Sequence, residues 1–180
     1  MKKLIAVYCS SRDNLGDDVT AEALEVARAI GAAGHDLIYG GVNAGLMHLV
    51  AQAAKDAGAH ITGVVPEVFS HRADPLCDTI ITAADLNERK GIMIARADAF
   101  VILPGGLGTI DEWISTLSDI MVRERVDPAA DRPILVLNLQ GMYDGMVMQL
   151  SSTAQSVYAR GKRVDRSLVF DSAAELIARL

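Results

Sequence analysis

Short, uninterrupted apolar runs recur along this chain, and each is followed by a longer stretch with helical spacing. The runs lie at residues 4–9, 36–39, 61–65, 79–82, 99–103 and 133–137, with a further one at 168–170. They are apolar throughout rather than at alternate positions, which is typical of parallel strands that helices cover on both faces. The alternation predicts an α/β fold with a Rossmann-like, doubly wound, mostly parallel sheet of about six or seven strands.

Helical spacing completes this plan. Apolar side chains recur on one face at about 19–33, 45–57, 85–97 and 109–122, and two more helical stretches are expected after residue 137. The charged, proline-bearing segment 123–132 is expected to be a mobile loop. Because the 180 residues contain no linker or repeat, residues 1–180 are expected to form one domain.

Composition excludes several classes of function. Lys and Arg number 17 against 23 Asp and Glu, a net charge of −6, which argues against binding nucleic acid polymers or anionic membranes. The first apolar run ends at Cys9 and is too short for a signal peptide or a membrane span. The two cysteines and four histidines show no ligand spacing, so neither a metal nor a cofactor is expected. A cytoplasmic location is expected.

Two glycine-rich segments follow predicted strands, where parallel sheets bind ligands. Residues 40–45 read GGVNAG and residues 104–109 read PGGLGT. Neither matches the dinucleotide fingerprint or an ATP-binding P-loop. Glycines nevertheless let the backbone approach an anion, and the following helix offers free N–H groups. The pair indicates a phosphate site for a small nucleotide, although tight strand-to-helix turns would also explain the glycines.

Charged residues lie at the start of the predicted helix 85–97. Asp85 and Glu88 have the spacing of an N-cap and its reciprocal partner. Arg89 and Lys90 follow them and oppose the helix dipole, by about 0.3–1 kcal/mol each. They lie either on a solvated face or beside an anionic ligand.

Glu112 has a similar ambiguity, because Thr109 and Glu112 also fit a capping pair. Alternatively, Glu112 lies beside the sugar of a nucleotide whose phosphate binds the preceding loop. The helix N-terminus is then expected to lower the pKa of Glu112. An ionised carboxylate there suits a nucleophile or an oxocarbenium stabiliser in glycoside-type cleavage.

These segments together resemble one known family. Residues 104–112, PGGLGTIDE, have the PGGxGTxxE pattern of the LONELY GUY family, and Glu88-Arg89-Lys90 also resembles it. Further similar segments are Cys9–Arg12, Tyr39–Gly41, Gly45–Met47 and Asn138–Asp144. Members are cytokinin-activating phosphoribohydrolases, long mislabelled as lysine decarboxylases. The resemblance implies a Rossmann-like fold, a homodimer with active sites near the interface, and hydrolysis of nucleoside 5′-monophosphates to free base and ribose 5-phosphate.

The resemblance also implies site residues. By motif match, Arg89 and Glu112 take the catalytic positions. The substrate- and phosphate-binding candidates are Ser10, Gly41, Gly45, Arg89, Lys90, Gly105, Gly106, Leu107, Gly108 and Thr109. Three departures affect the base pocket and the dimer: Val42, His48 and the segment 118–121. Asp119 in that segment is expected to be exposed, hydrogen-bonded or paired with an arginine, and to make the base pocket polar enough to favour AMP.

Two rival functions remain. A noncatalytic carrier of a nucleotide or of molybdenum cofactor could use the same fold, but Arg89 and Glu112 favour an enzyme, since a carrier does not need that carboxylate. Amino-acid decarboxylation typically needs a Schiff-base lysine with pyridoxal phosphate. Lys90 is the only lysine in these motifs, and it lies in a charged helical turn.

Overall fold

The strands form one parallel sheet. The computed structural model describes residues 1–155 and 167–180. Its sheet has seven strands in the order β4-β3-β2-β1-β5-β6-β7, and each adjacent pair is parallel. The strands are β1 Leu4–Tyr8, β2 Asp36–Tyr39, β3 Ile61–Pro66, β4 Thr79–Ala83, β5 Ala99–Ile102, β6 Ile134–Leu137 and β7 Ser167–Phe170. The predicted fold class is confirmed, and every predicted strand agrees within one residue at each end.

Helices connect these strands. They are α1 Asp17–Ala32, α2 Gly45–Asp56, α3 Leu86–Arg96, α4 Leu107–Arg123, α5 Asp144–Gln155 and α6 Ala173–Ile177. Short 3-10 turns occupy Glu67–Arg72, Pro128–Ala130 and Leu139–Gly141. The turn at 67–72 was not predicted, because it buries none of its residues and has no hydrophobic spacing. Two helical stretches were expected after residue 137, and any part of them within 156–166 lies outside the described residues.

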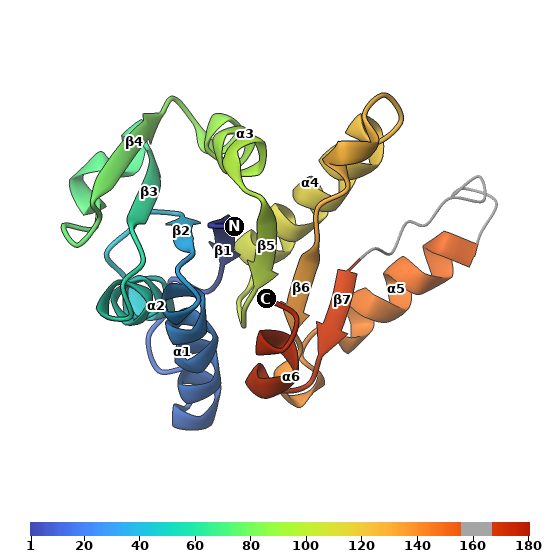
Figure 1. Ribbon diagram of the computed structural model, residues 1–180, viewed down its shortest axis with the longest axis horizontal. Helices are drawn as coiled ribbons and strands as arrows, with labels where there is room; N and C mark the ends of the chain where they lie inside the picture. Colours follow the sequence, from blue (N-terminus) through green and yellow to red (C-terminus); the bar gives the residue numbers. More distant parts are fainter. Residues whose placement is uncertain (156–166) are drawn as a thin grey trace.

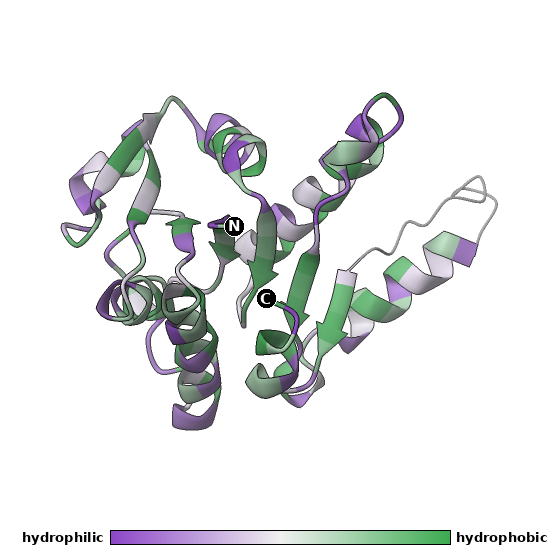
Figure 2. Ribbon diagram, viewed as in Figure 1, coloured by the Kyte–Doolittle hydropathy of each residue, from purple (hydrophilic) through white to green (hydrophobic). Residues whose placement is uncertain are grey.

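The helices cover the sheet in two layers (Figure 1). One apolar cluster joins α1, α2 and α6 to alternate strand residues such as Ile5 and Val7. The other joins α3, α4 and α5 to the strand residues between them, such as Ala6 and Tyr8. Figure 2 shows β5 and β6 as mostly hydrophobic and the helices as mixed. Burial on both faces is therefore the physical cause of the uniformly apolar runs.

The connections reverse direction between β1 and β5. Chain order runs outward from β1 through β2, β3 and β4, and then returns to pair β5 with the other side of β1. The loops after β1 and β5 therefore diverge into opposite layers and leave a crevice between them. A backbone hydrogen bond from Ser10 N to Pro104 O, 3.1 Å long, joins the two loops at the base of this crevice.

The charged segment after α4 is tied to the rest of the fold at its last residue. Arg132 Nη1 donates to the carbonyl oxygens of Ile94 and Ala97, at the end of α3. The guanidinium also lies 5.0 Å from the centre of the Phe100 ring. Arg132 therefore links the end of this segment to α3 and β5, while the mobility expected for residues 123–132 stays a prediction. Among the described residues, no helix is both long and apolar enough to cross a membrane.

Candidate active site

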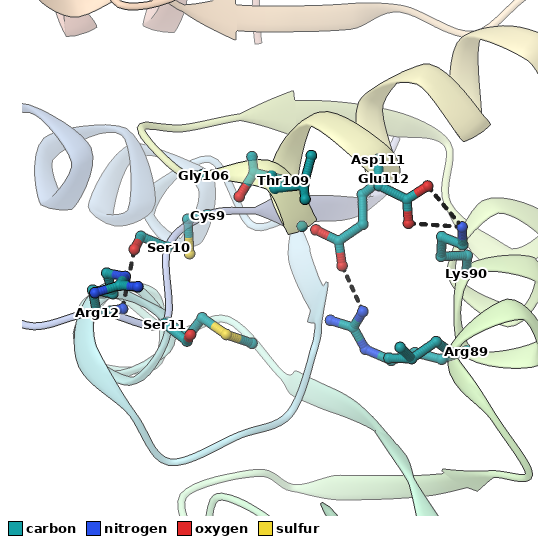
Figure 3. Close-up of a pocket in the computed structure, with 14 residues that line it drawn as sticks. Cys9, Ser10, Ser11, Arg12, Arg89, Lys90, Gly106, Thr109, Asp111 and Glu112 are labelled. Carbon is teal, nitrogen blue, oxygen red and sulfur yellow. Dashed lines mark hydrogen bonds and ion pairs between the residues drawn. The ribbon is translucent and has the colours of Figure 1, made fainter.

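A pocket opens at the crevice between β1 and β5 (Figure 3). Its volume is about 410 Å³, within the usual range of small-molecule sites, about 300–1,000 Å³. Four segments line it: the loop 9–12 after β1, and the first turns of α2, α3 and α4. Because these segments belong to both helix layers, the pocket lies where the two layers meet at the edge of the sheet.

Arg89 and Glu112 meet in this pocket. Arg89 Nη1 donates to Glu112 Oε1 at 2.6 Å, and the two side chains are only 12% and 8% exposed. Arg89 Nε also donates to the carbonyl oxygen of Val64, at 3.1 Å. A Cβ at residue 40 would overlap Arg89 Nη2, so Gly40 leaves the space that the guanidinium occupies. The two predicted catalytic residues therefore form a held, nearly buried ion pair.

The environment of Glu112 differs from two expectations. Helix α4 begins at Leu107 with Gly106 as its N-cap, and no side chain caps it, so Thr109 and Glu112 do not form a capping pair. Burial raises the pKa of Glu112, and the Arg89 guanidinium acts in the opposite direction. The expected lowering of this pKa is therefore wrong, because the loss of solvent has the largest effect on this carboxyl.

The start of α4 presents unpartnered backbone donors to the pocket. Its first helical bond runs from Ile110 N to Gly106 O, at 3.1 Å, which leaves the N–H groups of residues 107–109 without helical partners. A Cβ at Gly106 or Gly108 would meet nothing within 4 Å. Nothing in the fold requires glycine at these two positions, and their bare backbone suits the approach of an anion.

The remaining candidates on this loop have different surroundings. Gly105 lies behind the pocket, where a Cβ would overlap the hydroxyl of buried Thr109. The Leu107 side chain is 83% exposed at the rim. In this loop, glycine at 105 serves packing, whereas the backbone at 106–109 faces the pocket.

The first glycine loop does not line the pocket. Gly41 has φ +68°, and a Cβ there would lie 2.5 Å from Val65 Cγ2. Gly45 has φ +49°, and a Cβ there would overlap the carbonyl oxygen of Arg12. The first amides of α2 are also occupied: Leu46 N donates to Arg12 O and Met47 N to Ser10 O. Gly41 and Gly45 thus shape the protein around the pocket.

Lys90 and Ser10 are both at the pocket. Lys90 Nζ donates to Asp111 Oδ2 at 2.8 Å and to Ser115 Oγ at 3.2 Å. Ser10 is buried, and its Oγ accepts from Arg12 N at 3.0 Å. The ammonium of Lys90 is held by a carboxylate, so it is poorly placed to form a Schiff base.

The three departures lie outside the pocket lining. His48 Nδ1 is 2.8 Å from Oδ2 of fully buried Asp74. Val42 forms an isolated antiparallel β-bridge with Ala73. Asp119 pairs with Arg123 Nε at 2.7 Å, as the expectation of an arginine partner required. Asp119 is not among the residues that line the pocket. Within this chain, it therefore cannot make the base pocket polar as predicted.

Other pocket residues narrow the chemistry. Burial raises the pKa of the Cys9 thiol well above its usual range, which disfavours a thiolate nucleophile. The described residues contain no group of three or more His, Cys, Asp or Glu side chains that could hold a metal ion. Arg12 and Asp111 line the pocket but were not among the predicted site residues. The position of Arg12 in the loop at the strand-order reversal could have indicated it.

Comparisons with known proteins identify the family of this chain. A family model described as possible lysine decarboxylase matches residues 47–180. The cytokinin riboside 5′-monophosphate phosphoribohydrolase of Mycobacterium tuberculosis is 34% identical over 174 residues, covering 93% of this chain and 88% of the relative. This chain belongs to the LONELY GUY family. An Arabidopsis thaliana member with the same enzyme name is 27% identical over 178 residues, covering 98% of this chain and 80% of the relative.

Solved structures share the fold of this LONELY GUY chain. A molybdenum cofactor binding protein from Rippkaea orientalis has a TM-score of 0.74 at 21% identity and covers 99% of this chain and 95% of its own. The molybdenum cofactor carrier protein from Chlamydomonas reinhardtii has a TM-score of 0.73 at 21% identity, with coverage of 99% and 96%. At this identity the likeness establishes the fold alone.

Proposed function

We propose that this chain hydrolyses the N-glycosidic bond of purine nucleoside 5′-monophosphates, of the cytokinin type or AMP, to free base and ribose 5-phosphate. The observation that carries the proposal is the Arg89–Glu112 pair, 2.6 Å apart and nearly buried, beside the uncapped start of α4. A phosphate bound at residues 106–109 would bring its attached sugar close to Glu112, one turn further along the same helix.

Glu112 is suited to the sugar. Its Oε1 is held by Arg89, while Figure 3 shows the other carboxylate oxygen directed into the pocket. As the C–N bond breaks, the electron pair leaves with the base, which takes up a proton, and positive charge develops at the anomeric carbon. The carboxylate stabilises or attacks that carbon in a low-dielectric site. Water then supplies the new hydroxyl oxygen and releases a proton.

The rim of the pocket is apolar. In the proposed binding mode, the base of the nucleotide would lie at this rim, beyond the sugar. Leu86 and Leu107 are exposed, and both line the pocket together with Met47. Aliphatic side chains at a pocket mouth gain by covering an apolar group of the ligand. This arrangement supports purine nucleotides that carry an apolar N6 substituent as well as AMP. Comparing kcat/KM for AMP and isopentenyl-AMP tests the contribution of the rim.

A noncatalytic carrier is the second candidate, and the fold likeness to molybdenum cofactor proteins favours it. Those neighbours are 21% identical, whereas the phosphoribohydrolase of M. tuberculosis is 34% identical. A buried carboxylate is costly in free energy, and a carrier of an anionic ligand gains nothing from one at the binding site. The enzyme is therefore the better supported function.

A homodimer in the cytoplasm is part of this proposal. The apolar face predicted for the helix at 109–122 mostly packs within the chain. Leu117 is buried, and Ile114 and Met121 pack against the apolar cluster that joins α3, α4 and α5 to the sheet. Val122 and Val126, at and beyond the end of α4, are exposed and support a contact there. Light scattering should give twice the 19.2 kDa chain mass; a clean monomer would contradict the dimer.

The test of the catalytic step is Glu112→Gln. The amide still accepts a hydrogen bond from Arg89 but cannot stabilise an oxocarbenium ion, so turnover of AMP should fall by about 1,000-fold or more. Calorimetry should show that the variant still binds AMP. Glu175→Gln, a change on α6 far from the pocket, is the matched control. Near-normal turnover by Glu112→Gln would refute the catalytic assignment.

A further inference from the structure

The charges that line the pocket are almost all used within the protein. Three cations reach it, on Arg12, Arg89 and Lys90, together with two carboxylates, on Asp111 and Glu112. Arg89 is paired with Glu112 at 2.6 Å, and Lys90 with Asp111 at 2.8 Å. The pocket therefore holds one positive charge in excess.

That excess charge belongs to Arg12. Within residues 1–155 and 167–180, its side chain forms no ion pair. Figure 3 shows Arg12 on the opposite side of the pocket from Arg89 and Lys90, next to Ser10. A phosphate monoester carries up to two negative charges, whereas the start of α4 offers only about half a positive charge. The backbone donors of α4 thus leave much of the charge of a phosphate unmatched.

The backbone of Arg12 is held in place by two hydrogen bonds and by the close packing of α2. Its N–H donates to Ser10 Oγ at 3.0 Å, and its carbonyl oxygen accepts from Leu46 N at 3.3 Å. Any Cβ at residue 45 would overlap that carbonyl, so the close packing of α2 against Arg12 requires Gly45. The Arg12 side chain is exposed, but this fixed backbone places its starting point at the edge of the pocket.

We propose that Arg12 is the phosphate-binding cation of this pocket. It closes on the phosphate from the β1 loop while the N–H groups of residues 107–109 bind from α4. A guanidinium can bind two phosphate oxygens at once, which fixes orientation as well as charge. Arg89 is left to hold Glu112 at the sugar, and Lys90 to hold Asp111. This inference rests on the proposed function for the identity of the ligand, but the anchoring step can be tested separately.

The experiment compares Arg12→Gln with Arg12→Lys and with Arg28→Gln, a change of the same charge on the outer face of α1. Calorimetry measures the Kd for AMP and for ribose 5-phosphate, and kinetics give kcat/KM for AMP and adenosine. Loss of a hydrogen-bonded charge should weaken binding of both phosphates by about 10–100-fold in Arg12→Gln. Arg12→Lys should recover part of this loss, and Arg28→Gln should match the wild type.

A further readout separates phosphate binding from a structural role. The ratio of kcat/KM for AMP to that for adenosine should fall in Arg12→Gln by the same factor as binding, because only AMP presents the phosphate. Equal losses for both substrates, or an unchanged Kd for AMP, would overturn the proposal while leaving the hydrolase intact. If the wild type fails to hydrolyse AMP but Arg12→Gln still loses ribose 5-phosphate binding, Arg12 stands and the proposed function falls.

Discussion

The two glycine-rich loops look alike in sequence but differ in what their glycines do. In the loop after β2, Gly41 and Gly45 have positive φ, and a side chain at either would collide with the protein itself. In the loop after β5, Gly106 and Gly108 have ordinary φ and open space around them. Gly41 and Gly45 therefore serve the fold, whereas Gly40 leaves room for Arg89. In the second loop, Gly105 serves packing, and the backbone at Gly106 and Gly108 is open to the proposed ligand.

This difference teaches how a glycine motif should be interpreted. A glycine that the chain's own packing requires is evidence about structure, even when it lies at the edge of a sheet where ligands bind. A glycine with no packing reason, beside unpartnered helical N–H groups, is evidence about a ligand. Substitution by alanine separates the two, because the first kind should change stability and the second should change binding.

The largest effect is expected at Gly41. In Gly41→Ala the methyl group meets Val65 at 2.5 Å with φ at +68°, so the free energy of unfolding should fall by about 2–4 kcal/mol. Urea denaturation measures this change. Gly34→Ala is the matched control, since its φ is also positive but its Cβ meets nothing within 4 Å, and it should lose less. Equal losses would show that packing adds nothing to the strain.

Gly40→Ala should affect catalysis more than stability. The new methyl group would displace the flexible end of Arg89 from Glu112. A shift of about 1 Å in such a contact can cost about 100-fold in rate, so kcat/KM for AMP should fall by about that factor. Steady-state kinetics together with denaturation measure both quantities. Normal kinetics would separate the first loop from the catalytic site altogether.

Gly106→Ala should produce the reverse pattern. Its Cβ is tolerated by the protein, so the free energy of unfolding should stay within about 0.5 kcal/mol of the wild type. The methyl group would narrow the approach to the N–H groups of α4, and binding of AMP should weaken about 10-fold, or about 1.4 kcal/mol. Isothermal titration calorimetry measures the Kd for AMP. Unchanged binding would remove the contrast between the two loops.

The smallest effect is expected from Glu112→Gln on stability, in the helix that follows the second loop. Burial raises the pKa of Glu112 in the folded chain, so its carboxyl favours folding only below the usual glutamate pKa, about 4.3. That contribution is lost as the pH rises. The variant should therefore melt slightly higher than the wild type at pH 7, with the difference shrinking toward pH 4. A variant that is less stable at pH 7 would show that the Arg89 pair outweighs burial.

Much of the fold could be predicted because its causes are local. Strands buried on both faces are apolar throughout, and residues 36–39 were predicted with the bounds that β2 has. The start of α4 was placed two residues late, at Thr109 instead of Leu107. Thr109 is a good N-cap residue and Gly106 an ordinary one, so local preference favoured the wrong residue. The helix begins at Leu107 with Gly106 as its N-cap.

The site was predictable in its residue types but not in its contacts. Arg89, Lys90 and Glu112 do line one pocket, as the motifs indicated. That Arg89 and Lys90 are each paired with a carboxylate depends on how α3 and α4 pack, 21–23 residues apart in sequence. The same holds for the bonds from Arg132 to the end of α3 and for the raised pKa of Glu112. Such properties come from tertiary neighbours, which spacing along the chain does not reveal.

The exposed side chain of Leu107 separates two tasks at one residue. Its N–H belongs to the donors at the start of α4, and its side chain projects from the rim with 83% of its surface accessible. A backbone N–H survives every substitution except proline, and no core packing constrains the side chain. Position 107 can therefore accept side-chain changes without loss of the backbone donors or of the fold. If the proposed function holds, such changes would alter base preference one step at a time.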